Sequence, residues 1–121
     1  MPSAAEVRPE KWTGLTVLFD NGEYSVISGF YEDDTRRALG ERWNGNGSNP
    51  LGFPTGRGYP VWHVIPRFLE IAILHALLDE LAIHPDLVPS PDSLQRYRMA
   101  ILGELGVRHQ ERALPIPERG A

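Results

Sequence analysis

Residues 15–30 read LTVLFDNGEYSVISGF, and this stretch decides the fold. Both of its halves are rich in β-branched and aromatic residues, and Asn21-Gly22 lies between them. An Asn-Gly pair favours a type I′ turn, in which both residues take positive φ, and such a turn joins two antiparallel strands. The sequence therefore predicts a β-hairpin that turns at residues 21–22.

A two-residue turn also sets the register of this hairpin. It pairs Phe19 with Tyr24 and Val17 with Val26, so that apolar side chains share one face. The predicted core face consists of Leu15, Val17, Phe19, Tyr24, Val26 and Phe30.

The segment after the hairpin, EDDTRRALGERW at residues 32–43, has two interpretations. Asp33 or Asp34 can cap a short helix that runs through Arg42. Gly40 would weaken such a helix, so an extended segment is the alternative. We interpret the acidic run at 32–34 as a solvated helix start rather than as a cation site.

Two prolines frame the next expected strand. Pro60 and Pro66 enclose VWHVI, whose β-branched residues predict a third strand at residues 61–65. A long helix is expected at residues 67–84, because Pro66 can open its first turn. This helix is apolar on nearly all sides, so one small sheet cannot cover it.

A second helix follows a proline-rich turn. Ser90 is the expected N-cap, Pro91 the first helical residue and Gly106 the residue that ends the helix. The order of elements predicts an α+β fold with two layers, in which a small antiparallel sheet (the β-hairpin plus a third strand) is covered by two C-terminal helices. The predicted division is a flexible lead at 1–11, a single α+β domain at 12–107 and a polar, proline-containing tail at 108–121.

The amino-acid composition limits the classes of protein to which this chain can belong. The chain has 121 residues, a formal net charge of -4 and no cysteine. Its acidic balance argues against a nucleic-acid partner, and the lack of cysteine excludes disulfides and fits a cytoplasmic location. No apolar run is long enough to span a membrane, so no membrane partner is expected. The apolar helix at 67–84 predicts a homodimer that covers this helix or a free edge of the sheet.

Catalytic and metal motifs are missing from the sequence. The patterns GxSxG and HExxH are absent, and no metal or cofactor is expected. His75 and Asp79 are four residues apart and share a helix face, where we interpret them as a structural hydrogen-bonded pair. An enzyme would need His63 or His75 to meet an acid and an arginine in one concave site.

The longest irregular segment, NGNGSNPLGFPTGRGYPVW at residues 44–62, is the predicted recognition site. It and its flanks combine aromatic residues with arginine, which are the types enriched at interface hot spots. The candidate binding residues are Trp43, Phe53, Arg57, Tyr59, Trp62 and His63. A structural interpretation is also open, in which Trp43 and Trp62 are core residues and Phe53 closes an Ω-loop.

Arg57 lies between two glycines and is the expected recognition residue, since a guanidinium can bind a carboxylate or a phosphate. We expect the loop at residues 44–59 to be ordered, because its prolines limit its conformational freedom. The sequence thus favours a small non-enzymatic binding or regulatory protein, whose partner is another protein or a small anionic ligand. Two alternatives stay open: a small-molecule-binding domain with a pocket between hairpin and helices, and a small hydrolase or transferase.

Overall fold

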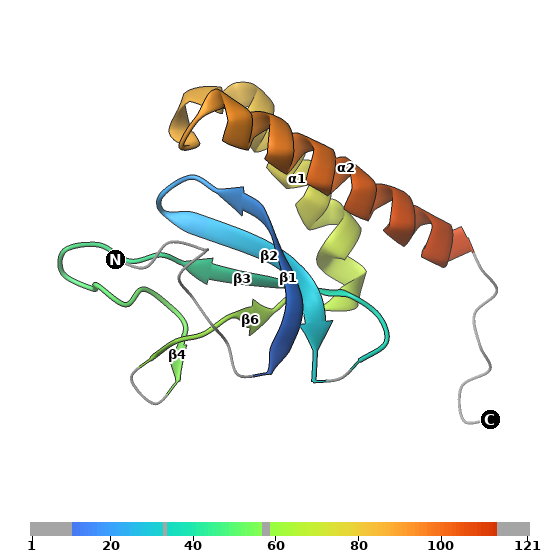
Figure 1. The fold of residues 1–121 in the computed structure, drawn as a ribbon, viewed down its shortest axis with the longest axis horizontal. Coiled ribbons are helices and arrows are strands. Elements are labelled where there is room, and N and C mark those ends of the chain that lie inside the picture. Colours follow the sequence, from blue (N-terminus) through green and yellow to red (C-terminus); the bar gives the residue numbers. More distant parts are fainter. Residues whose placement is uncertain (1–10, 33, 57–58, 114–121) are drawn as a thin grey trace.

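A computed structural model describes residues 11–32, 34–56 and 59–113. The main sheet is antiparallel, with the strand order β1-β2-β3-β6 (Figure 1). Its strands are β1 (Trp12–Asp20), β2 (Tyr24–Tyr31), β3 (Ala38–Trp43) and β6 (His63–Val64). The short strands β4 (Thr55–Gly56) and β5 (Tyr59–Pro60) form a separate pair. The helices are η1 (Arg67–Leu69), α1 (Glu70–Ile83), η2 (Pro85–Leu87) and α2 (Pro91–Ala113).

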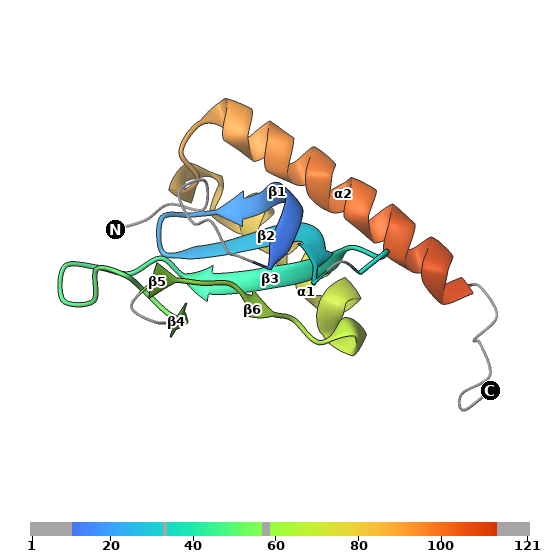
Figure 2. The same cartoon turned by 60° about the horizontal axis from the view of Figure 1, so that its bottom comes forward.

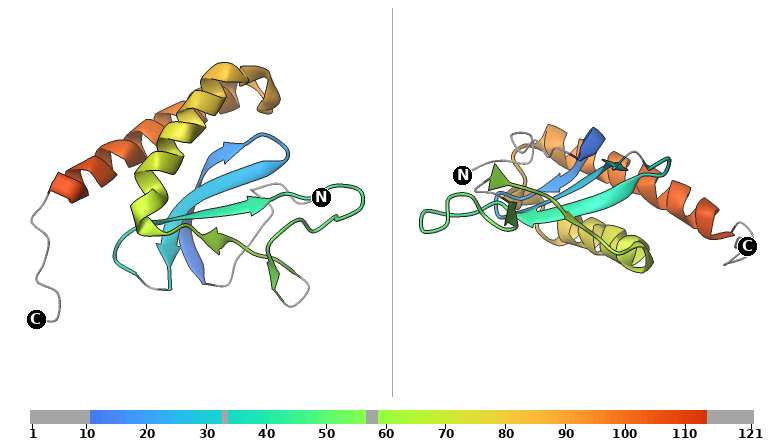
Figure 3. Two further views of the ribbon diagram at one scale, coloured as in Figure 1. Left: turned by 180° about the vertical axis from the view of Figure 1, so that it is seen from behind. Right: turned by 90° about the horizontal axis from the view of Figure 1, so that it is seen from below.

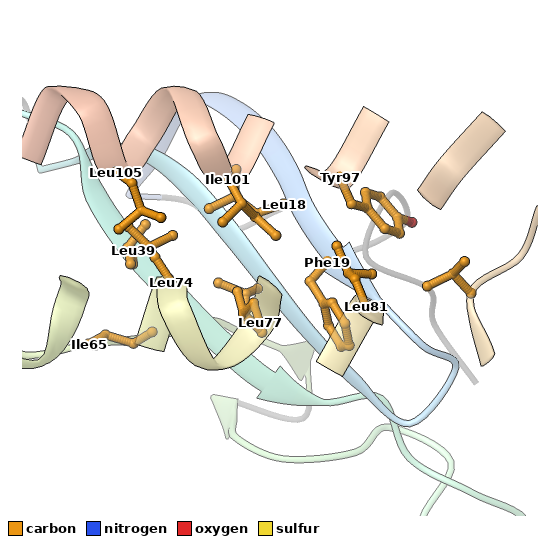
Figure 4. Packing of buried hydrophobic residues seen from close by; sticks show 12 residues of the cluster. Leu18, Phe19, Leu39, Ile65, Leu74, Leu77, Leu81, Tyr97, Ile101 and Leu105 are labelled. Atoms are coloured by element: carbon orange, nitrogen blue, oxygen red, sulfur yellow. The ribbon is translucent and has the colours of Figure 1, made fainter. Parts of the chain in front are cut away.

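Both long helices lie on the same face of the sheet, as the view in Figure 2 makes clear. The main core fills the space between these two layers (Figure 4). Its buried side chains include Leu18, Phe19, Val26 and Leu39 from the sheet, Leu74, Leu77 and Leu81 from α1, and Tyr97, Ile101 and Leu105 from α2. The chain is therefore a two-layer α+β protein with a small antiparallel sheet covered by two C-terminal helices, as the sequence predicts.

The opposite face of the sheet has a smaller core of its own. Trp12, Ile27, Ala38 and Trp62 are buried together there. This second cluster covers a face that no helix of the described residues reaches, so the sheet is apolar on both sides.

The turn of the hairpin differs from the prediction. Gly22 takes a φ of 91°, but Asn21 is not among the described residues with positive φ, so the type I′ turn is wrong. Instead, the Asn21 side-chain oxygen accepts hydrogen bonds from the backbone N–H groups of Glu23 and Tyr24, at 3.0 and 2.9 Å. This side-chain cap holds a wider turn, and the observed register pairs Phe19 with Val26 rather than with Tyr24.

A β-bulge in β1 corrects the predicted core face. The register shifts between Val17 and Phe19, so that Leu18 is an extra residue in the strand. Consequently, Leu18 and Phe19 both enter the main core. Leu15, which simple alternation places in the core, is 38% exposed. A bulge interrupts the two-residue period on which the prediction depended.

The segment at 38–43 is a strand and not the predicted short helix. β3 pairs with β2 over its whole length, which is the extended alternative. Glycine suits position 40 of this strand, because a Cβ there would lie only 3.1 Å from the Trp12 ring, which is closer than an ordinary contact. The strand predicted at residues 61–65 is present as β6, shortened to His63–Val64 and paired with β3.

The two helices form where they are expected, with one difference at the end of α2. Ser90 accepts a hydrogen bond from the Ser93 N–H at 3.1 Å, which confirms the predicted N-cap. The prediction that Gly106 ends the helix is wrong, because α2 continues to Ala113. The extra turns place Arg108 in a buried ion pair with Glu70 of α1, at 3.1 Å. The predicted division at residue 108 stays untested as a domain boundary, although residues 108–113 are helical.

Candidate functional site

Three aromatic side chains form a row across the end of the sheet. Tyr24 of β2 is the register partner of Trp43 of β3, and Trp43 forms a β-bridge with Phe53. Trp43 and Phe53 exchange both backbone hydrogen bonds, at 2.7 and 2.9 Å. Residues directly opposite one another in antiparallel pairs point to the same face, so all three rings lie on one side. The Tyr24 and Trp43 ring centroids are 5.0 Å apart.

This row is open to solvent. Trp43 is 55% exposed and Phe53 is 65% exposed, whereas Tyr24 is half-buried against the core. Figure 3 (left) shows why: the helices cover one part of this face, and the end of β3 with the loop after it extends beyond them. Exposed aromatic side chains of this size next to each other are a common feature of interaction surfaces.

A polar pair borders the aromatic row. Glu41 is two residues before Trp43 on the same face of β3, and its register partner in β6 is His63. The Tyr24 hydroxyl donates a hydrogen bond to Glu41 Oε1 at 2.8 Å, and His63 Nδ1 lies 3.9 Å from Glu41 Oε2. We call these five residues, Tyr24, Glu41, Trp43, Phe53 and His63, the aromatic surface.

Burial and the neighbouring carboxylate change the acidity of Tyr24. Burial is the larger cause, followed by the hydrogen bond to Glu41 and its negative charge, and together they raise the pKa of Tyr24 far above the ordinary value of 10.0. Tyr24 is therefore a protonated donor at neutral pH. Its hydroxyl holds the Glu41 carboxylate in one orientation.

The loop at residues 44–52 is anchored at its start by a buried amide. The Asn44 side chain accepts a hydrogen bond from Ser25 Oγ at 2.7 Å and donates one to Asp20 Oδ1 at 3.1 Å. The Asn44 backbone N–H donates to the Glu23 carbonyl at 2.7 Å. These contacts join the loop to the hairpin turn, so Trp43 lies on a fixed segment.

The tip of this loop is a compact turn. Asn46 Oδ1 accepts hydrogen bonds from the Ser48 and Asn49 N–H groups, each at 2.9 Å. Gly52 then brings the chain back to β3 with a φ of 73°. A Cβ at Gly52 would lie 2.0 Å from the Trp43 carbonyl oxygen, so only glycine fits there. The described part of the predicted ordered loop, 44–56, is thus defined by specific contacts.

The structure separates the predicted binding residues into groups. Trp43, Phe53 and His63 meet on the aromatic surface. Trp62 is buried in the second cluster on the opposite face of the sheet, in accordance with its structural interpretation. Arg57 lies outside the described residues, and for Tyr59 only the backbone, in β5, is described.

Tyr24 and Glu41 are the two site residues that sequence reasoning missed. Tyr24 was expected in the core because the predicted register placed it opposite Phe19. Glu41 was expected in a helix. The alternation of leucine, glutamate and tryptophan at positions 39, 41 and 43 is the signal that could have identified a strand with these residues on one face.

Other candidate chemistry is sparse in the described part of the chain. His75 and His109 contact each other at a ring-centroid distance of 6.0 Å, away from the aromatic surface. No group of three or more potential ligands that could hold a metal ion is present among residues 11–32, 34–56 and 59–113. Within the same ranges, no helix has the length and apolar character needed to cross a bilayer.

Comparison with protein-family models, curated proteins and solved structures found no match to this chain. The function is therefore inferred from the geometry of the aromatic surface.

Proposed function

We propose that this chain is a small non-enzymatic binding protein, and that the aromatic surface binds a basic segment of another protein. The observation that carries the proposal is the row of Tyr24, Trp43 and Phe53, in which two large rings are more than half exposed at a hydrogen-bonded sheet end. Aromatic side chains on a rigid backbone bury a large area at a small entropic cost, which favours their use as binding anchors.

The polar border of the surface favours a cation. Glu41 Oε1 accepts from Tyr24, while Oε2 lies 3.9 Å from His63, which is longer than a hydrogen bond. That oxygen can accept a hydrogen bond from a lysine or arginine of the partner. The exposed indole of Trp43 lies next to it and can stack on the same cation, with a gain of about 0.5–2 kcal/mol. A carboxylate and an indole side by side thus match one basic side chain.

Two alternative functions are less well supported. The space between hairpin and helices, where a small-molecule pocket was considered, is occupied by core side chains such as Leu18, Phe19 and Leu77. A hydrolase or transferase would use His63 with Glu41. That hypothesis also requires an arginine. The group that contacts Glu41 here is Tyr24, whose raised pKa keeps it protonated, so it is a poor base or nucleophile.

The experiment measures binding of fluorescent peptides to the full chain by anisotropy. We expect peptides with adjacent lysine and arginine to bind, and peptides with glutamate in their place not to bind. Trp43→Ala should weaken binding at least about tenfold, or about 1.4 kcal/mol. Glu41→Gln should remove the preference for basic peptides. Met99→Ala, which changes an exposed apolar residue of α2, is the matched control and should bind as the wild type does. Equal binding of basic and acidic peptides would refute the proposal.

Three further expectations remain proposals. Arg57 is kept as a second recognition residue for a small anionic ligand. A cytoplasmic location is proposed from the cysteine-free composition. A homodimer is proposed on the exposed side of η1 and α1, where Phe68 and Ile83 lie at the two ends of a face that carries Ala72, His75, Ala76 and Asp79 between them.

A further inference from the structure

On the sheet face opposite the aromatic surface, two buried side chains have donors without acceptors. Arg42 is 1% exposed, and its Nε and Nη1 have no hydrogen-bond partner. Trp62 is 5% exposed, and its indole Nε1 has no partner either. A buried donor without an acceptor costs roughly 1–3 kcal/mol, and more when it is charged. Two such groups in a small protein require an explanation.

The two side chains are carried by neighbouring strands. β3 and β6 pair Gly40 with Val64 and Glu41 with His63, so the same register, continued by one residue, places Trp62 opposite Arg42. Arg42 and Trp62 therefore share a face. Trp62 belongs to the cluster with Trp12 and Ile27 on that face. The register thus places the indole and the guanidinium at facing positions on one side of the sheet.

Within the described residues, the charge of Arg42 is not neutralised. Its one hydrogen bond is from Nη2 to the Leu51 carbonyl, and none of the ion pairs there includes Arg42. Asp20 is on the same face of the sheet as Arg42, but Ser25 of β2 lies between Asp20 and Arg42 in the register. Burial alone lowers the pKa of Arg42, with no acid to offset it. An isolated buried charge is costly unless it is paired.

We propose that Arg42 and Trp62 form a binding site for one carboxylate group of a ligand. The remaining Arg42 N–H groups and the indole N–H can together donate to both oxygens of a carboxylate. A carboxylate carries one negative charge and would neutralise the single charge of Arg42, whereas a phosphate dianion would leave an excess buried charge. Leu51 contributes its backbone carbonyl, which accepts from Arg42 Nη2, so Nε and Nη1 remain for the ligand.

This site is independent of the proposed function, because the aromatic surface lies on the other face of the sheet. Its test uses the full chain and acetate as the probe. The chain has three tryptophans, so the indole N–H region of a ¹H–¹⁵N NMR spectrum has few signals, and the Trp62→Phe variant identifies that of Trp62. Titration with sodium acetate is compared with sodium chloride and sodium phosphate at equal ionic strength. The Nε–H signal of Arg42 is followed in the same spectra.

We expect acetate to shift the Trp62 indole and Arg42 Nε–H signals in a saturable way, with no saturable shift from chloride. Acetate should also raise the Tm of the wild type, since a ligand that binds only the native state stabilises it. Arg42→Met should lose both effects, while Arg112→Met, at an exposed position of α2, should keep them. Equal responses to acetate and chloride, saturation by phosphate alone, or an acetate effect that persists in Arg42→Met would overturn the proposal. If Arg42→Met does not fold, the wild-type spectra decide.

Discussion

Asn44 is the residue on which the geometry of the aromatic surface depends most directly. It is the buried residue next to the exposed Trp43, and its side chain joins the loop to Ser25 and Asp20. An amide has both a donor and an acceptor, so it can satisfy a hydroxyl and a carboxylate at the same time. An aspartate or leucine of similar size would leave at least one of these two partners without its hydrogen bond.

Tyr24 makes the stability of the protein depend on pH. In the unfolded chain its hydroxyl loses the proton near the ordinary pKa of 10.0, whereas the folded chain keeps the proton to higher pH. The unfolded state is therefore favoured as pH rises above that value, and below it this contribution to stability is fully present. We expect the free energy of unfolding to fall at alkaline pH, and to fall less steeply in Tyr24→Phe. Urea denaturation on both sides of pH 10 measures this.

The control for this experiment is Glu41→Gln, which removes the negative charge while a polar side chain remains. The pKa of Tyr24 should then move back toward its ordinary value, but only in part, because burial is the larger cause. Tyr97 also has a raised pKa, mainly through burial, so part of the alkaline loss should persist in both variants. Identical alkaline profiles for wild type and Tyr24→Phe would contradict the assignment.

At the scale of elements, the loop at 44–52 is an extension of β3 that returns beside it through the Trp43–Phe53 bridge. The glycines of this loop have different structural roles. Gly52 takes a left-handed φ next to the Trp43 carbonyl, while a Cβ at Gly47 would meet nothing within 4 Å. Of these two glycines, Gly52 is the one that the backbone requires.

The matched pair Gly52→Ala and Gly47→Ala tests this difference. Gly52→Ala should destabilise the protein by about 1–3 kcal/mol from backbone strain alone, with an additional cost from the clash. Gly47→Ala should change stability by less than about 0.5 kcal/mol, as expected for an exposed site. Chemical denaturation monitored by tryptophan fluorescence would report both. Similar effects of the two changes would mean that the turn is not as described.

α1 and α2 are joined by a buried ion pair as well as by apolar contacts. Glu70 and Arg108 are each almost completely buried, and Glu104, one turn before Arg108, also pairs with it. Removal of the arginine would leave the Glu70 carboxylate buried with only a distant cation, Arg36 at 3.9 Å. Such a change usually costs more than the pair itself contributes.

Arg108→Met should therefore destabilise the protein by about 3–5 kcal/mol. The double variant Glu70→Gln with Arg108→Met should recover part of this loss, since no charge then remains buried at that position. Arg112→Met, four residues later and exposed, serves as the control. The free energies of unfolding come from urea titrations. A double variant as unstable as Arg108→Met alone would show that Glu70 is not the reason for the loss.

For the molecule as a whole, the two faces of the sheet have different roles. One face is covered by α1 and α2 and leaves the aromatic surface open at the end of β3 (Figure 3). The other face has the second cluster with the buried Arg42 and Trp62.

The proposed homodimer is tested by light scattering at micromolar protein concentration. We expect twice the mass of the chain, and we expect Phe68→Glu to give the monomer mass, because Phe68 is 77% exposed at the start of that face. A charged residue that becomes buried in the contact would be desolvated without a partner. Met99→Glu, on the exposed side of α2, should leave the mass unchanged. A monomeric wild-type protein would contradict the dimer.

The sequence by itself determined the elements that depend on local interactions. The hairpin, the two long helices and the Ser90 N-cap follow from turn residues, apolar periodicity and capping within a few positions of each other. Two layers follow as well, because a helix as apolar as α1 requires a sheet and a second helix to cover it. The loop at 44–62 was singled out as a recognition site for its aromatic residues and arginine, and that role stays a prediction.

Only the tertiary structure decided what depends on distant partners. Residues 38–43 became a strand because β2 supplied hydrogen bonds along its edge, which outweighs weak helix propensity. The bulge at Leu18 and the register of the hairpin depend on packing against α1 and α2. Trp43 is exposed and Trp62 is buried although both flank the same loop, because the two residues lie on opposite faces of the sheet. The sequence alone does not contain that difference, since it arises from the pairing of β3 with β6.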